Sequence, residues 1–154
     1  GLVDATMVIC DGVQIVVDAA ERRAFKPSPR CYRGEIDAGD PARIDWYAMP
    51  AHPGPARYRM AATGVAARGL IVFAGGSDNP YNYNGIGYDG EPSAPSDAVF
   101  AWSLDERRWL ELGRLAEATM DHRALLVAGD ALVIVGGMRA GQTVSAGVLR
   151  FTLP

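Results

Sequence analysis

The sequence predicts an all-β protein built from a repeated unit. A short apolar run that ends in two glycines occurs twice, at residues 70–76 (LIVFAGG) and 131–137 (ALVIVGG). A turn-forming pair, Arg68-Gly69 in one copy and Gly129-Asp130 in the other, begins seven residues before the first glycine of each doublet. The segments between these landmarks are strand-sized and show no helix-length 3.6-residue periodicity, so we expect an all-β repeat.

A third, weaker copy of the unit is expected near the N-terminus. Asp11-Gly12 precedes the mostly apolar residues 13–17 (VQIVV), and Asp18-Ala19 then stands where the other copies have glycine pairs. The registers at 18, 75 and 136 place the copies roughly 60 residues apart, which is enough for several strands but too short for an independent domain. Each unit is therefore expected to pack against its neighbours.

Every unit follows the same order of elements. A strand-like segment precedes the turn, and a variable loop and then a β-rich segment follow the glycines. A Trp-bearing segment ends the unit, with Trp46 in the first copy and Trp109 in the second, whereas the third copy ends before such a segment. We therefore expect four short strands per unit and an unfinished last unit.

This order of strand, Gly-Gly, loop, β segment and Trp resembles the kelch repeat, in which each unit is one four-stranded blade of a β-propeller. The resemblance implies a kelch-type propeller segment of about three four-stranded antiparallel blades, at residues 1–56, 57–116 and 117–154, with the last blade lacking its fourth strand. It is distantly similar to kelch propellers of the galactose oxidase and sialic acid epimerase types. The glycine pairs and tryptophans are interpreted as structural.

Three blades alone would leave two open flanks, because closed propellers have roughly four to eight blades. Exposed sheet edges and faces favour aggregation unless something covers them. We expect the remaining propeller blades to come from the same chain or from another chain. A homodimer that completes a six-bladed ring is the alternative.

Composition excludes several other partners. With 15 basic and 18 acidic residues the net charge is −3, and no basic cluster interrupts the sequence, so neither nucleic acid nor a membrane is an expected partner. No apolar run approaches the roughly 20 residues of a membrane span.

The two cysteines have different expected environments. Cys10 is expected to be a buried thiol in a strand and Cys31 to lie in a loop, and whether the two form a disulfide is left undecided by the sequence. The sequence does not indicate a cellular compartment.

The loop at residues 77–96 is the main candidate binding segment, since it contains three Tyr, three Asn, two Asp and one Glu. Aromatic rings can stack on sugars while amides and carboxylates hydrogen-bond hydroxyls, and Tyr and Asn also make adaptable protein-binding loops. The structural alternative is a loop that folds on itself. The candidate ligand-binding residues here are Asn79, Tyr81, Tyr83, Asn84, Tyr88 and Asp89.

A second group of candidates precedes the first strands of the units: Arg59, His122 and Arg123. In kelch propellers the strand before the turn tends to be innermost, so the resemblance places these side chains at the mouth of the central channel. Arginine there can grip a carboxylate through a bidentate pair. The alternative is a buried contact between blades.

The sequence favours a non-catalytic interaction scaffold that binds a protein or peptide partner through its blade loops. The alternative is a carbohydrate-binding or carbohydrate-active propeller, similar to a sialic acid epimerase, with a pocket at the channel mouth. No catalytic, metal-ligating or cofactor-binding residues are assigned. The only histidines are His52, expected to be exposed in a proline-rich connector, and His122, and neither joins a copper-site pattern.

Overall fold

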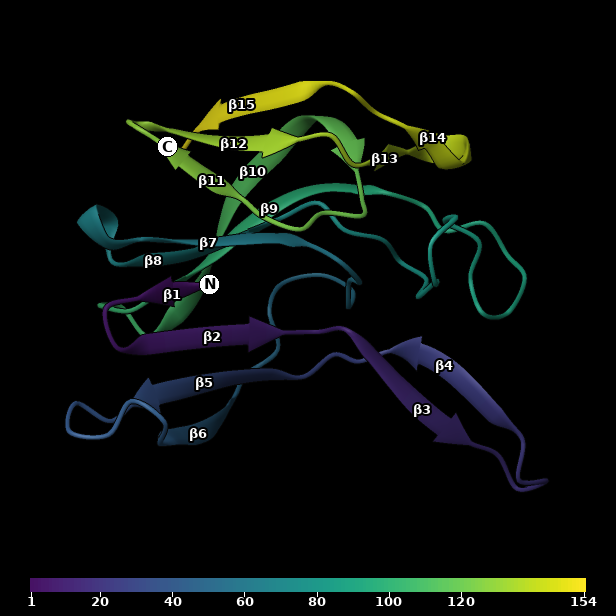
Figure 1. The fold of residues 1–154 in the computed structure, drawn as a ribbon, viewed down its shortest axis with the longest axis horizontal. Helices are drawn as coiled ribbons and strands as arrows, with labels where there is room; N and C mark the ends of the chain where they lie inside the picture. Colours follow the sequence, from purple (N-terminus) through teal and green to yellow (C-terminus); the bar gives the residue numbers. More distant parts are fainter.

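The computed structural model describes all of residues 1–154, and its regular secondary structure is almost entirely β-strand (Figure 1). Three antiparallel sheets stack face to face along the molecule, and two small hairpins project from one end. The remaining regular elements are two short 3₁₀ turns, Ala66–Arg68 and Ala140–Gln142. The structure contains no helix that could span a membrane.

The three sheets contain four, four and three strands. The first has the order β1-β2-β5-β6, with β1 at Leu2–Val3, β2 at Thr6–Cys10, β5 at Cys31–Ile36 and β6 at Ile44–Met49. The second runs β7-β8-β9-β10, with β7 at Ala61–Val65, β8 at Leu70–Ala74, β9 at Ser96–Ser103 and β10 at Arg108–Thr119. The third has the order β11-β12-β15, with β11 at Leu126–Ala128, β12 at Ala131–Val135 and β15 at Val148–Thr152. This architecture confirms the expected all-β partial propeller whose last blade lacks a fourth strand.

The segment after the second strand of each sheet differs between the three units. It is the hairpin β3 (Val13–Val17) and β4 (Arg23–Pro27) in the first, and the hairpin β13 (Met138–Arg139) and β14 (Thr143–Val144) in the third. In the second unit it is the long loop that precedes β9. All three segments lie at the right-hand end in Figure 1, so the variable parts of the units share one end of the molecule.

The expected register of the first copy is wrong by one strand. Val13–Val17 pairs with Arg23–Pro27 and not with β2, and Asp18-Ala19 lies at the turn of that hairpin. Asp11-Gly12 occupies the doublet position instead, with φ of 61° and 108°, against 69° and 91° at Gly75-Gly76. Aspartate tolerates the left-handed region, so it can replace the first glycine without changing the backbone.

A repeated hydrogen bond supports this corrected register. The carbonyl of the second doublet residue accepts the backbone amide of a serine in each unit, and that serine is buried or nearly so each time. The three bonds are Ser28 to Gly12 at 3.1 Å, Ser96 to Gly76 at 2.8 Å and Ser145 to Gly137 at 2.9 Å. The backbone repeat therefore extends through all three units, including the one whose glycine is replaced.

The core lies between the sheets because the central sheet is buried on both faces. All five residues of β8 are buried, which explains why this strand is a continuous apolar run and does not alternate. Ile71 and Phe73 pack with Val8 of the first sheet, whereas Val72 packs with Leu132 of the third sheet. Successive side chains of β8 point to opposite faces of the central sheet and thus contact the first and the third sheet in turn.

Trp109 lies at the junction between the first two sheets. Its indole Nε1 donates to the carbonyl of Pro50 at 2.8 Å, and its ring meets Trp102 edge to face at 5.3 Å. Pro50 directly follows the fourth strand of the first sheet. Trp109 therefore holds the connector from one blade against the next, which is the structural role expected for it.

Candidate binding site

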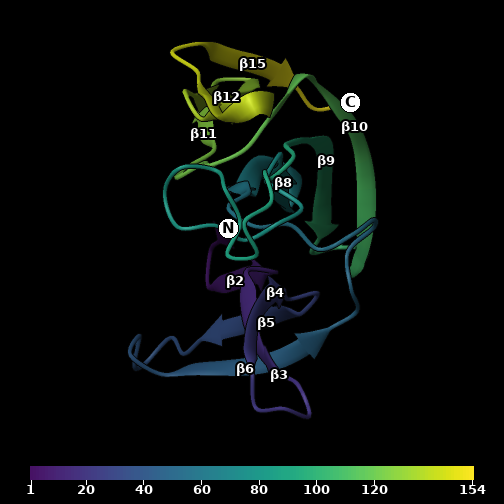
Figure 2. The same ribbon diagram turned by 90° about the vertical axis from the view of Figure 1, so that its right-hand side faces the viewer.

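The long loop touches both hairpins, so the three variable segments form a continuous surface. The rings of Phe25 in the first hairpin and Tyr88 in the long loop have centroids 4.3 Å apart. On the other side, the amide Nε2 of Gln142 donates to the carbonyl of Ser93 at 3.2 Å. Figure 2 faces this end of the molecule, with the long loop in front of the central sheet. We call the surface formed by residues 13–27, 77–95 and 138–144 the loop face.

The long loop is held in shape by its own hydrogen bonds. Asn79 donates through Nδ2 to Oδ1 of Asp89 at 2.8 Å, and the carbonyl of Asn79 accepts from the hydroxyl of Ser93 at 2.9 Å. Asn84 Oδ1 accepts the amide of Ile86 at 3.1 Å. The hydrogen bond from Asn79 and that from the Glu91 amide lower the pKa of Asp89. Asn79, Asn84 and Asp89 therefore brace the loop.

The three loop tyrosines have different environments. Tyr81 is fully buried against Tyr58, Met120 and Met138, and its hydroxyl has no hydrogen-bond partner. Burial raises the pKa of Tyr81. The side chains of Tyr83 and Tyr88 are 76% and 48% exposed. Only these last two are presented to a ligand, since Tyr81 anchors the loop to the blades.

Arg59, Asp121 and Arg123 form a charged cluster beside the loop. One carboxylate oxygen of Asp121, Oδ1, accepts from Arg59 Nη1 at 2.7 Å and from Arg123 Nη1 at 2.9 Å. The Arg59 guanidinium also lies 4.9 Å from the ring centroid of Tyr81 and donates to the carbonyl of Asn82 at 2.6 Å. Arg59 is thus fixed, whereas the Arg123 side chain is mostly exposed.

His122, the third candidate of that group, is packed between the second and third sheets. A Cβ at Gly75 would lie 2.9 Å from its Nε2, and a Cβ at Gly137 would lie 2.8 Å from its Cε1. Neither ring nitrogen has a hydrogen-bond partner, and burial lowers the pKa of His122. The two glycine doublets therefore make room for this imidazole, which occupies a contact between blades.

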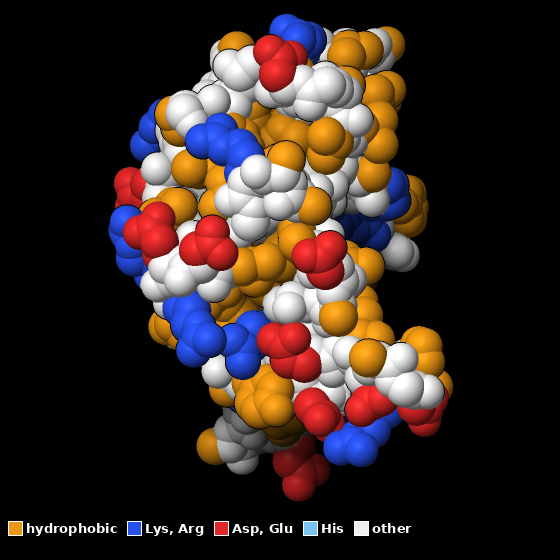
Figure 3. All heavy atoms as spheres, turned by 90° about the vertical axis from the view of Figure 1, so that its left-hand side faces the viewer, with side chains coloured by type: hydrophobic (Ala, Val, Ile, Leu, Met, Phe, Trp, Pro, Cys, Tyr) orange, Lys and Arg blue, Asp and Glu red, His pale blue; other side chains and the backbone are white.

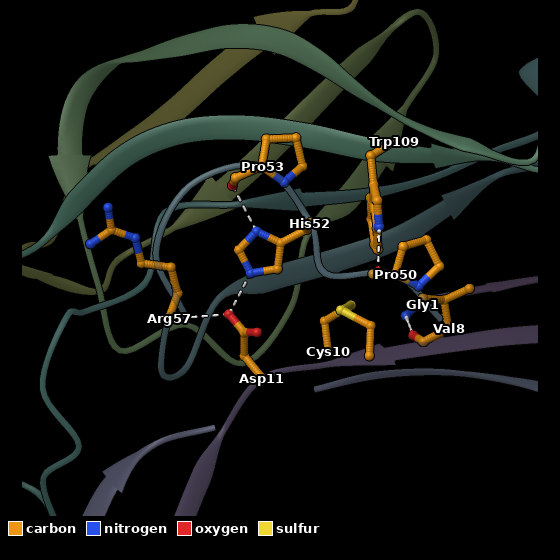
Figure 4. Close-up of a disulfide and its surroundings, with 10 residues drawn as sticks. Gly1, Val8, Cys10, Asp11, Pro50, His52, Pro53, Arg57 and Trp109 are labelled. Carbon is orange, nitrogen blue, oxygen red and sulfur yellow. Dashed lines mark hydrogen bonds and ion pairs between the residues drawn. A yellow bond between two sulfur atoms is a disulfide. The ribbon is translucent and has the colours of Figure 1, made fainter. Parts of the chain in front are cut away.

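A buried ion pair near the N-terminus was missed by the sequence analysis (Figure 4). His52 is buried, which corrects the expectation of an exposed connector histidine, and its Nε2 lies 2.7 Å from Oδ2 of Asp11. The same carboxylate oxygen accepts the amide of Arg57 at 2.5 Å. The sequence signal for this pair was Asp11, which stands where the other units have the first glycine of the doublet. Glycine has no side chain at that position, whereas the aspartate side chain can reach the connector.

The disulfide left open by the sequence is formed beside this pair. Cys10 and Cys31 lie opposite each other on β2 and β5 and are joined, so neither is a free thiol. Cys31 begins a strand and is not in a loop. The bridge closes the base of the hairpin β3-β4, which is therefore anchored to the first sheet.

The opposite end of the molecule has no dominant charge. Figure 3 shows Lys and Arg side chains interspersed with Asp and Glu side chains over this end. Opposite charges also pair within the first sheet, where Arg33 Nε lies 3.0 Å from Oε1 of Glu35. No three His, Cys, Asp or Glu side chains gather as a metal site in the chain.

Comparison with known proteins supports the fold. A solved structure described as the structure of YjhT superimposes with a TM-score of 0.67 over 97% of this chain, with 14% sequence identity. The chain spans 40% of the length of that structure. No family model and no curated protein matches the sequence. The blade-like sheets and this likeness define the chain as part of a β-propeller-like fold.

Proposed function

We propose that the chain is a kelch-type propeller segment that acts as a non-catalytic scaffold and binds a protein or peptide partner through its loop face. The observation that carries the proposal is the joining of all three variable segments into one surface that exposes apolar side chains. Tyr83 and Tyr88 belong to the long loop, Ile15 and Val17 to the first hairpin and Val144 to the second, and all five are exposed. The strands of the three stacked sheets are committed to packing, so binding falls to the segments outside these sheets.

The physical basis is a braced loop with exposed aromatic anchors. Tyrosine presents a large amphipathic surface with few rotatable bonds, so little conformational entropy is lost when it contacts a partner. The hydrogen bonds within the loop reduce the ordering cost further, because the backbone is already fixed. Several polar atoms that a sugar would need, Asn79 Nδ2, Asn84 Oδ1 and Asp89 Oδ1, already hydrogen-bond inside the loop. These features favour a peptide surface over a saccharide.

The test is selection of a displayed library of random peptides on the full chain. We expect enriched peptides whose affinity falls at least tenfold in the variant Tyr83→Ala/Tyr88→Ala. The matched control is Tyr47→Ala, since Tyr47 is similarly exposed but lies on β6, outside the loop face. Peptides that bind the loop variant as well as the native chain, or the absence of any enrichment, would contradict the proposal.

A carbohydrate ligand is the second candidate, and the charged cluster is the observation that favours it. Arg123 keeps an exposed guanidinium beside Asp121, which suits a ligand that carries a carboxylate, such as an acidic sugar. A glycan array that includes acidic saccharides tests this candidate. Binding that disappears in Arg123→Gln supports it, and failure to bind any glycan excludes it.

A further inference from the structure

The hairpin of β3 and β4 is a sheet of two strands, so each strand has one edge without a neighbouring strand. Backbone hydrogen bonds at the two ends of the hairpin show which residues face these edges. The amide of Ser28 donates to the carbonyl of Gly12 at 3.1 Å, and the amide of Asp18 donates to the carbonyl of Arg22 at 3.1 Å. Hydrogen-bonded pairs alternate with non-hydrogen-bonded pairs along an antiparallel ladder, so they recur at every second residue between these ends.

Val13, Ile15 and Val17 of β3 therefore direct their amide and carbonyl groups away from β4. In the register of the hairpin these three residues fall between the hydrogen-bonded pairs. All three are exposed, and β4 is the only strand that pairs with β3. The outer edge of β3 thus presents a row of unused backbone donors and acceptors in extended geometry.

The outer edge of β4 is less suited to a partner strand. Pro27 has no amide hydrogen, and its carbonyl already accepts from Nε2 of Gln14 at 3.1 Å. Arg23 and Lys26 also place charges on β4. Proline and charged side chains are the residues that keep edge strands unpaired in natural sheets, and β3 contains neither. The edge that can accept a further strand is therefore that of β3.

The side chains of Val13, Ile15 and Val17 lie on the same face of the hairpin as Phe25. Phe25 packs on Tyr88, so this face is turned toward the long loop of the second unit. The three aliphatic side chains are 44%, 56% and 57% exposed although the neighbouring unit on that side is present. They form an open apolar row beside the unpaired edge, within the loop face.

One charged side chain shares this face. Arg23 lies opposite Val17, is exposed and has no salt-bridge partner. A carboxylate at that end of a bound segment would pair with the guanidinium. The surface therefore favours an extended segment with apolar residues at alternate positions and an acidic residue near the turn of the hairpin.

We propose that the peptide partner binds as an added β-strand, antiparallel to β3, through backbone hydrogen bonds to Val13, Ile15 and Val17. This inference rests on the proposed function and specifies the conformation and sequence class of the partner. The acidic residue lies at the N-terminal end of the segment, because an antiparallel strand starts beside the hairpin turn. Backbone hydrogen bonds give affinity in such strand addition, and alternate side chains give specificity. The Cys10–Cys31 disulfide anchors the hairpin, so the edge is formed before the partner arrives.

The test uses the most enriched peptide from the library selection and a matched pair of variants. Ile15→Pro removes one outward amide and adds a proline ring at the edge, but it leaves the hydrogen bonds between β3 and β4 in place. Ile15→Ala shortens the same side chain and keeps the amide. We expect the proline variant to bind roughly tenfold more weakly than the alanine variant, because a backbone hydrogen bond is lost and the ring blocks the edge. Far-UV circular dichroism checks that both variants are folded.

Amide hydrogen exchange of the native chain, followed by NMR, is a second readout that needs no variant. Addition of the peptide should slow exchange at Val13, Ile15 and Val17 and leave exchange at Phe25, on the opposite edge, unchanged.

The outcomes separate this inference from the proposed function. Equal binding by the two folded Ile15 variants, or unchanged exchange at the β3 amides, would overturn strand addition. Binding that is still lost in Tyr83→Ala/Tyr88→Ala would in that case continue to support the loop face. The absence of any enriched peptide would overturn both proposals.

Discussion

His52 is doubly hydrogen-bonded through its imidazole ring, to Oδ2 of Asp11 at 2.7 Å from Nε2 and to the carbonyl of Pro53 at 2.8 Å from Nδ1. A carboxylate and a carbonyl can only accept hydrogen bonds, so both contacts are satisfied when the imidazole is protonated and both ring nitrogens donate. The ring also stacks on Phe100 of the central sheet, with centroids 4.3 Å apart. One charged side chain thus joins the first doublet, the connector and the second blade.

Removal of the Asp11 carboxylate is expected to destabilise the protein strongly. In Asp11→Asn the imidazolium of His52 loses its counter-charge in a buried site, which costs roughly 3 kcal/mol of unfolding free energy. Urea-induced unfolding measures the change. The control is Asp18→Asn, whose exposed salt bridge with Arg22 is worth less than about 1 kcal/mol. Equal effects of the two substitutions would contradict the role assigned to the buried pair.

The two histidines are expected to give opposite pH dependence. For His52, burial disfavours the charged ring, but the hydrogen bonds to Asp11 and Pro53 and the charge of Asp11 outweigh it, so the pKa is raised above 6.5. Its contribution to stability is therefore present below pH 6.5 and is lost as the pH rises through the folded-state pKa. For His122 burial lowers the pKa, so stability is lost as the pH falls below 6.5.

Unfolding free energies of His52→Gln and His122→Gln at about pH 5.5 and about pH 8.5 measure this difference. The destabilisation by His52→Gln should be larger at the acidic pH. The destabilisation by His122→Gln should be smaller there, because the substitution also removes the cost of protonating a buried ring. If the destabilisation caused by the two substitutions changed in the same direction between the two pH values, the environments of the two histidines would have been assigned incorrectly.

The Cys10–Cys31 disulfide is expected to stabilise the first blade. It joins β2 to β5 across a sequence separation of 21 residues. For a loop of this size, the double variant Cys10→Ala/Cys31→Ala should lose about 3 kcal/mol of unfolding free energy. Urea unfolding gives the value, and thiol titration of the native protein should detect no free cysteine. Two reactive thiols in the folded protein would refute the pairing.

Gly137 is expected to be needed for close approach as well as for its backbone conformation. A Cβ there would lie 2.8 Å from the carbonyl oxygen of Met120, whereas a Cβ at Gly129 would meet nothing within 4 Å. Both residues have positive φ, so Gly129→Ala isolates the backbone cost of about 1 kcal/mol. Gly137→Ala should cost roughly 3 kcal/mol. Thermal or urea unfolding that gives equal losses would argue against the close contact.

The sequence predicted the fold class well, because glycine doublets after apolar runs are a local signal. It misplaced the first unit because two adjacent strands, residues 6–10 and 13–17, are both apolar and both follow a turn. The choice between them depends on the pairing of β2 with β5, a contact between residues distant in sequence. The turn and glycine-doublet motifs are local in sequence, so they do not indicate which distant strand β2 pairs with.

The candidate site was predictable as a segment but not residue by residue. The unusual composition of residues 77–96 identified the loop, yet composition does not distinguish buried Tyr81 from exposed Tyr83. The same limit applies to His52, whose proline-rich surroundings indicated an exposed connector. Its burial follows from an aspartate 41 residues earlier, which only the folded chain brings within reach.

The register of the first blade determines both the repeat and the place of the first hairpin in the loop face. Cross-strand nuclear Overhauser effects in the NMR spectrum of the full chain test it directly. The structure predicts contacts between the backbone protons of β2 and β5, such as Ile9 with Tyr32, and between β3 and β4, such as Ile15 with Phe25. Contacts that instead pair residues 6–10 with residues 13–17 would contradict this register.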